Sequence, residues 1–151
     1  MRGAIGRYSN AEQSDIGSDY GEVSLTERGL AGRPVGERRD DGHAASEISN
    51  AVVSLFADYL GRGPTRARTV LGRDLVAVVL EETMTKAERR LVLEGQDETV
   101  VETRRVFQRT MREDLVAAVE RITGRSVVAF LSDHTTAPDV SVEVFVLAPN
   151  G

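Results

Sequence analysis

The sequence contains no cysteine among its 151 residues. Disulfide bonds and thiolate metal sites are therefore excluded, which fits a reducing compartment such as the cytoplasm. No apolar run approaches the roughly 18 residues that would cross a bilayer. The N-terminal segment MRGAIGR also lacks the apolar core of a signal peptide. The sequence thus predicts a soluble, cytoplasmic protein that meets a membrane only peripherally or through a partner.

Signatures of common catalytic and nucleotide sites are lacking as well. The glycines at 61–64 are not followed by Gly-Lys-Ser/Thr, and they follow a predicted helix rather than a strand, which excludes phosphate-binding and dinucleotide-binding loops. There is no Gly-x-Ser-x-Gly segment. Asp133, His134 and Asp139 offer metal-ligand side chains, but no second histidine is expected in the folded part. We expect no catalytic residue, no metal and no cofactor.

The charge balance is mildly acidic, with a net charge of −5 and a pI near 5.1. Nucleic-acid-binding domains usually have a basic surface, so this balance disfavours that function, although a local patch could still support it.

Residues 1–45 differ in composition from the rest. They hold eight of the fourteen glycines, and their charges of both signs follow no period. Such a segment buries too little apolar surface to offset its chain entropy. We therefore predict a disordered tail over 1–45 and a folded domain over 46–151.

The first predicted helix starts at Ser46, a residue type that caps helices, and ends at Gly61, with Pro64 preventing its continuation. Apolar residues at spacings of three and four give it one buried face. These residues are Ile48, Val52, Leu55, Phe56 and Tyr59.

A hairpin is predicted over 69–80, because β-branched residues flank Gly72 and Arg73, which suit a tight turn with glycine first. Its second strand, 76–80, is almost wholly apolar. We expect that strand to be central in a sheet.

Thr85 and Glu88 form a capping box that opens a short helix ending at Gly95. A long helix is predicted over 98–123, ended by Gly124. Its expected buried stripe consists of Val100, Phe107, Met111, Leu115, Ala118, Val119 and Ile122.

Two further strands are predicted over 127–131 and 140–147, joined by a polar loop over 132–139. In the last strand only Glu143 is polar, which suggests that both faces of the sheet are covered.

The resulting order is α-β-β-α-α-β-β. It predicts an α+β fold with a four-stranded, mostly antiparallel sheet packed with helices. The Gly-Arg pairs at 61–62 and 124–125 hint at an internal α-β-β repeat. Apolar strands and a hairpin left at a sheet edge favour a homo-oligomer, a dimer or larger.

Arginines gather in two places, after the first helix and on the long helix. Arg66 and Arg68 should share one side of an extended segment. A guanidinium can grip a carboxylate, phosphate or bicarbonate at two points. Ordinary surface arginines paired with neighbouring acids remain the alternative. The candidate residues for binding an anion or a partner are Arg62, Gly63, Pro64, Thr65, Arg66, Arg68, Arg105, Arg109 and Arg112.

Several separated segments resemble the MpsC-like family over about 46–148. They are EISN (47–50), GRGPTRAR (61–68), MTKAER (84–89), FQRTMR (107–112) and TGRSVV (123–128). The family's name implies association with a cation-translocating system that generates membrane potential, and related membrane components are linked to uptake of inorganic carbon. The resemblance supplies no catalytic residues.

The leading hypothesis is therefore a soluble, non-enzymatic accessory or regulatory protein of a membrane potential-generating, inorganic-carbon-linked transport system, acting through contact with a membrane transport subunit. An oligomeric module that senses a small anion or a nucleotide is the alternative. Nucleic-acid binding through the same arginines is the third hypothesis.

Overall fold

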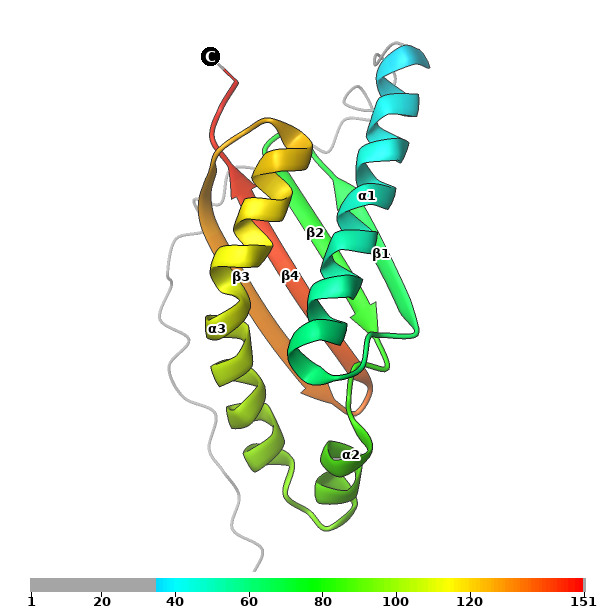
Figure 1. Cartoon of the computed structure of the whole chain (residues 1–151), viewed down its shortest axis with the longest axis vertical. Coiled ribbons are helices and arrows are strands. Elements are labelled where there is room, and N and C mark those ends of the chain that lie inside the picture. The colour runs from blue at the N-terminus through cyan, green and yellow to red at the C-terminus, as the bar shows by residue number, and fades with distance from the viewer. Residues whose placement is uncertain (1–34, 151) are drawn as a thin grey trace, which may run out of the picture. The chain divides into compact units, whose positions relative to one another are not determined.

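The protein is described here by a computed structural model that covers residues 35–150. The elements are α1 (Val35–Leu60), β1 (Arg66–Leu71), β2 (Leu75–Glu81), α2 (Lys86–Leu93), α3 (Asp97–Thr123), β3 (Val127–Thr136) and β4 (Asp139–Leu147). Figure 1 shows this order along the chain. The predicted α-β-β-α-α-β-β order and the α+β class are confirmed.

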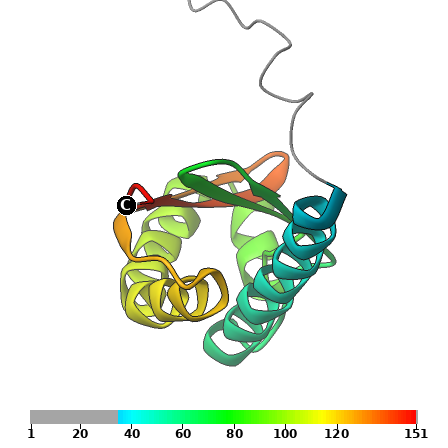
Figure 2. The ribbon, with the colours of Figure 1, turned by 90° about the horizontal axis from the view of Figure 1, so that it is seen from above.

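The four strands form one antiparallel sheet in the order β1-β2-β4-β3. The strand β2 is central, as its apolar sequence predicts, and β4 is the other central strand. All the helices lie on one side of the sheet (Figure 2). On that side α1 lies against β1 and α3 against β3. We call the helix-covered side the inner face and the opposite side the outer face. The expectation that both faces are covered is wrong for the described residues, because none of them covers the outer face.

The hydrophobic core lies between the inner face and the helices α1 and α3. Strict alternation along β2 sends Val76, Val78 and Leu80 inward, and β4 contributes Phe145 and Leu147. The helices supply Ile48, Val52, Phe56, Met111, Leu115 and Val119. Most of the apolar stripes expected on both helices thus form the core.

The first helix begins earlier than its sequence pattern indicates. It starts at Val35, and the Ser46 hydroxyl donates a hydrogen bond of 3.0 Å to the carbonyl of Gly42 inside the helix, so Ser46 is not its cap. Charged residues fill the first turns and give no apolar stripe, so periodicity carries no signal there. Residues 1–34 of the predicted tail lie outside the described residues.

The polar loop expected over 132–139 is mostly strand. Only Ala137 and Pro138 separate β3 from β4, and they are joined by a cis peptide bond. The strand continues through polar residues because Ser132 and His134 face the polar residues Glu143 and Ser141 on β4. In the other hairpin the turn centres on Arg73 and on Asp74, one residue later than predicted, and the Gly72 amide donates to the Leu75 carbonyl at 2.7 Å.

The two α-β-β halves repeat one local structure, in keeping with the repeat that the Gly-Arg pairs suggested. Gly61 ends α1 and Gly124 ends α3, each with positive φ. Arg62 then donates to the carbonyl of Met84, shortly after β2. Arg125 donates in the same way to a carbonyl immediately after β4. Each arginine therefore ties the end of a helix to the end of the central strand in its own half.

Glycine-to-alanine substitutions should have opposite effects at two positions. Gly124→Ala should lower the free energy of unfolding by about 1 kcal/mol, because alanine is strained at a φ of 67°. Gly42→Ala, inside α1 and with no atom near the new methyl group, should raise it by up to about 1 kcal/mol. Urea unfolding monitored by circular dichroism measures both. Destabilisation by Gly42→Ala would contradict the early start of α1.

Candidate functional site

Polar side chains replace the apolar core at one end of the inner face, where α2 and the first half of α3 approach the strands. Seven polar or charged residues are buried there, and we call them the buried polar cluster. They are Thr83, Glu88, Arg104, Gln108, His134, Ser141 and Glu143. Buried charge is costly unless it is paired, so this cluster is the first place to look for function.

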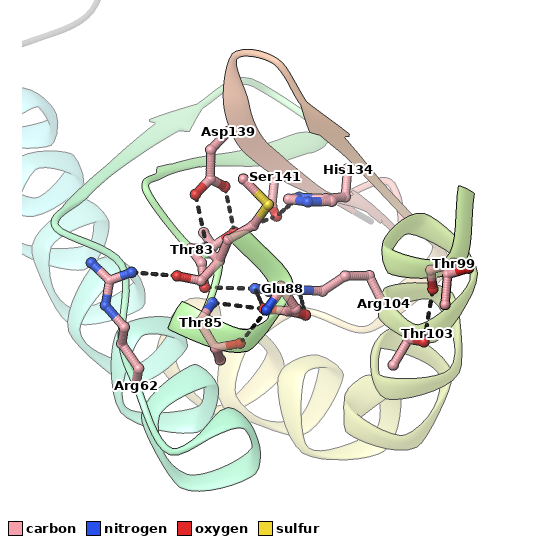
Figure 3. A network of polar contacts seen from close by, with 11 residues as sticks. Arg62, Thr83, Thr85, Glu88, Thr99, Thr103, Arg104, His134, Asp139 and Ser141 are labelled. Atoms are coloured by element: carbon pink, nitrogen blue, oxygen red, sulfur yellow. Dashed lines mark hydrogen bonds and ion pairs between the residues drawn. The ribbon is translucent and has the colours of Figure 1, made fainter. Parts of the chain in front are cut away.

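An ion pair between Arg104 and Glu88 is the centre of this cluster (Figure 3). Arg104 donates from Nε to Oε1 at 2.6 Å and from one terminal nitrogen to Oε2 at 2.7 Å. The same terminal nitrogen donates to the Thr83 carbonyl at 2.6 Å. The arginine is 1% exposed. This two-point contact fixes α2 and α3 against the chain that follows β2.

Glu88 also completes the capping box of α2. The amide of Thr85 donates to its Oε2 at 2.7 Å, and its own amide donates to the Thr85 hydroxyl at 3.2 Å. Burial alone would raise the pKa of Glu88, but the hydrogen bonds from Arg104 and Thr85 outweigh it and hold that pKa below its usual range. The carboxylate stays ionised, and one side chain serves both the helix cap and the ion pair.

A second set of hydrogen bonds connects residues at or near the ends of β2, β3 and β4. The Thr83 hydroxyl donates to Asp139 at 3.0 Å and lies 3.3 Å from the Ser141 hydroxyl. Ser141 Oγ lies 2.8 Å from Nδ1 of His134. Burial, and then the charge of Arg104, lower the pKa of His134, which favours the neutral ring. Two of the three residues considered for metal binding lie on opposite faces of the sheet, since Asp133 is exposed on the outer face and His134 is buried on the inner one.

Glu143 has an unusual position for a carboxyl group. It lies mid-way along the central strand β4, between Val78 of β2 and Ser132 of β3, and is 0% exposed. Neither of its carboxyl oxygens forms a hydrogen bond of good geometry with a described residue, although the Ser132 and Gln108 side chains lie close to the carboxyl. Burial raises its pKa to about 8, although Ser132, Arg104 and Gln108 oppose the shift. Glu143 is therefore mainly protonated and uncharged at neutral pH.

A surface pocket of about 230 Å³ opens beside Glu143, between α3 and β3. We call it the arginine pocket. It is lined by Arg105, Gln108, Arg109, Arg112, Phe130 and Ser132. The guanidinium carbon of Arg112 lies 5.9 Å from the centre of the Phe130 ring, a cation–π contact. Spacings of four and three along α3 bring the three arginines to one flank of the helix.

The structure thus brings together the second group of candidate residues, Arg105, Arg109 and Arg112, but not the first. Arg62 is held by a backbone carbonyl, whereas Arg66 lies on the outer face, 3.5 Å from Glu81. The remaining members of the first group lie nearby. Gly63 and Pro64 form the loop before β1, Thr65 donates to Glu82, and Arg68 is exposed on the outer face.

Three buried residues of the site are not in the set of candidate residues chosen from the sequence. Arg104 and Gln108 continue the stripe of Val100 and Met111 at spacings of four, four and three, so their position on the helix carries the signal. Glu143 was noted only as the polar exception in an apolar strand. A lone carboxyl in such a strand, at a register position that faces inward, is the signal that could have found it.

None of the described helices is both long and apolar enough to cross a membrane. The domain is a two-layer α+β structure with an arginine-lined pocket over a buried carboxyl. A family model described as "Na+-translocating membrane potential-generating system (MpsC)" matches residues 40–149. The chain belongs to this family.

One relative is "Uncharacterized protein YbcI" of Bacillus subtilis (strain 168). It is 32% identical over 113 residues, which cover 73% of this chain and 90% of the relative. No solved structure matches the chain.

Substituting Glu143 should change how stability depends on pH. An unfolded glutamate ionises near pH 4.3, whereas the folded protein holds this proton up to about pH 8. Between these values the folded state binds the extra proton, so stability falls as pH rises, by about 1.4 kcal/mol per unit. The glutamine in Glu143→Gln cannot ionise, so the free energy of unfolding of this variant should lack this dependence on pH.

Urea unfolding of both proteins at about pH 5 and about pH 8 should show the variant gaining several kcal/mol relative to the parent at the higher pH. Glu98→Gln, an exposed change on the same helix as the pocket, is the matched control and should follow the parent. Parallel slopes for Glu143→Gln and the parent would show that the buried carboxyl ionises normally.

Proposed function

We propose that this protein is a non-catalytic accessory component of the membrane potential-generating system after which its family is named. In this proposal it acts in the cytoplasm, as a dimer, through contact with other proteins. The family membership supports the link to that system. The observation that carries the mode of action is the outer face of the sheet, which no described residue covers.

The outer face is apolar along its middle. The strand register sets its side chains in rows that cross the sheet. Arg68, Val79, Val142 and Asp133 form one row; Val70, Ala77, Val144 and Leu131 form the next; Leu75, Val146 and Ala129 form the third. Val70 is 55% exposed and Leu131 is 57% exposed. A contiguous apolar patch of this kind on a folded domain is typical of a protein interface.

The two edges of this face carry opposite charges. Arg66 and Arg68 lie on β1 at one edge, and Asp133 lies on β3 at the other. The arginine at 68 and the aspartate share one row, so they lie at the same height along the strands. The face is therefore complementary to a rotated copy of itself.

A two-fold axis parallel to the strands would place β1 of one copy over β3 of the other. Arg68 of each copy would then meet Asp133 of its partner, while the valines pack between them. An axis across the strands would instead oppose the two β1 edges and bring like charges together. Charge complementarity favours the first arrangement, which is the face-to-face packing of aligned β-sheets.

Two substitutions of leucine by lysine should show whether the outer face, and not another part of the surface, forms the dimer interface. Leu131→Lys places a charge in the apolar row and should convert the dimer to a monomer, because burying an unpaired ammonium is costly. Leu93→Lys, at an even more exposed site on α2, should leave the dimer intact. Sedimentation equilibrium at micromolar concentrations measures both. A parent protein that stays monomeric throughout would refute the dimer.

The orientation can be tested by charge reversal. Arg68→Asp or Asp133→Arg alone should weaken the dimer by about tenfold or more, because each single change places two residues of like charge opposite each other at two points of the symmetric interface. The double variant restores both pairs and should regain most of the affinity. Additive weakening in the double variant would refute the proposed axis.

The link to a membrane system should be visible by affinity capture from detergent-solubilised membranes of the host, read by mass spectrometry. We expect the parent protein to recover an integral membrane transport subunit. Arg66→Ala should reduce this recovery, because the Arg66 side chain is 80% exposed at the edge of the sheet, beside the loop of the first arginine group. Arg90→Ala is the matched control, since that arginine is 74% exposed and also forms a single surface ion pair, with Glu94.

Recovery of the protein alone would count against the accessory role while leaving the dimer untouched. We also propose that this system is linked to inorganic-carbon uptake, as the family resemblance implies. Removing the protein and measuring membrane potential and growth at low carbon dioxide tests this link. No change in either would contradict it.

A further inference from the structure

The arginine pocket carries positive charge that no carboxylate of the described residues neutralises fully. Of its three arginines, only Arg105 forms an ion pair within the described part of the chain, a long one of 3.4 Å with the exposed Glu102. Arg109 and Arg112 form no ion pair with any described residue, and Arg112 lies over the Phe130 ring. Three guanidinium groups around one concave surface attract an anion, and each can donate two hydrogen bonds to its oxygens.

The floor of the pocket offers further polar groups. The Ser132 hydroxyl is buried and forms no hydrogen bond of good geometry with a described residue, although it lies close enough to the Glu143 carboxyl to oppose the rise of its pKa. The Gln108 side chain, 5% exposed, lines the pocket beside it. A buried hydroxyl without a hydrogen bond of good geometry is costly, so a ligand oxygen at this floor would satisfy a group that the protein leaves open.

Glu143 lies directly behind this floor. It is the register partner of Ser132 on the neighbouring strand and shares its inward face, and Gln108 is close enough to influence its ionisation. In the protonated form it adds no charge and can donate a hydrogen bond. In the ionised form it places a negative charge behind the three arginines.

We propose that the arginine pocket binds a small oxyanion of the phosphate or sulfate class, and that ionisation of Glu143 weakens this binding. The guanidinium groups of Arg105, Arg109 and Arg112 hold the anion, and Ser132 and Gln108 donate to it from the floor. The protein thereby couples anion occupancy to proton concentration. This activity goes beyond the proposed accessory role and does not depend on it.

Other charged groups face Glu143 from the elements packed against it. They are Arg104 on α3, Glu88 on α2, His134 on β3 and Asp139 at the start of β4. Arg104 and Glu88 pair with each other, and Asp139 accepts hydrogen bonds from Thr83 and from a backbone amide. Burial lowers the pKa of His134, so its ring has already lost its proton before the pH reaches 8. A change of affinity near pH 8 is therefore assigned to Glu143.

The test is titration calorimetry with sodium sulfate, whose charge is constant over the range used. Affinity should fall by about tenfold between about pH 6.5 and about pH 9, as expected for a unit charge near the bound anion. Glu143→Gln should bind equally at both pH values, because its amide stays neutral. A parent protein whose sulfate affinity is the same at both pH values would refute the coupling.

Arginine variants test the position of the site. Arg109→Ala should lower sulfate affinity by about tenfold or more, since a two-point contact is lost. Arg89→Ala is the matched control, because it removes the same charge from an exposed position on α2 outside the pocket. Equal loss in the two variants would show non-specific attraction and overturn the site.

Parallel titrations with phosphate and with adenosine monophosphate distinguish binding of a free oxyanion from binding of a nucleotide phosphate. Comparable binding of sulfate and phosphate supports the proposal, and binding of the nucleotide alone contradicts it. Leu131→Lys should bind sulfate like the parent protein. This last result keeps failure of the pocket distinct from failure of the dimer.

Discussion

The buried ion pair between Arg104 and Glu88 constrains the rest of this domain. Hydrogen bonds from its nitrogens stabilise a buried guanidinium group. Here two nitrogens of Arg104 donate to one carboxylate, and one of them also donates to the chain after β2, while the other terminal nitrogen has no hydrogen-bond partner among the described residues. Because Glu88 is also the capping residue of α2, the helix cannot move without breaking the pair. The contact therefore holds α2, α3 and the end of β2 in one arrangement, and it places polar residues where the core would otherwise continue.

This arrangement explains why a carboxyl without a hydrogen bond of good geometry can persist at the centre of the sheet. The Arg104 guanidinium forms its ion pair with Glu88 rather than with Glu143, so its charge only partly opposes the rise in the pKa of Glu143, and burial prevails. The neighbouring arginines on α3 lie outside the core, where they stay solvated and open to an anion. One helix thus presents a structural arginine inward and three pocket-lining arginines outward, and the difference follows from helical spacing alone.

The sequence predicts the fold well where one signal acts alone. Apolar alternation along β2, the capping box at Thr85 and the glycine at 124 all have local causes, and the structure confirms each. Prediction fails where two signals compete. The strand β3 runs through Ser132 and His134 because their partners lie on β4, which no local pattern reveals.

The candidate site is likewise predicted only where a local pattern in the sequence is enough. Helical spacing predicts that Arg105, Arg109 and Arg112 share a side, but it cannot show that β3 supplies the opposite wall of their pocket. Arg104 looks like its neighbours in the sequence, and only its place in the buried stripe separates it from them. The unpaired state of Glu143 is a tertiary property, since it depends on which residues fail to reach it.

The proton that Glu143 retains has a thermodynamic consequence for folding itself. At neutral pH the unfolded chain carries an ionised carboxylate at this position and the folded chain carries a carboxylic acid. Folding therefore takes up close to one proton from the surrounding buffer. The heat released on folding then includes the ionisation enthalpy of that buffer, so the calorimetric enthalpy of this protein differs between phosphate and an amine buffer although every contact in the fold is the same.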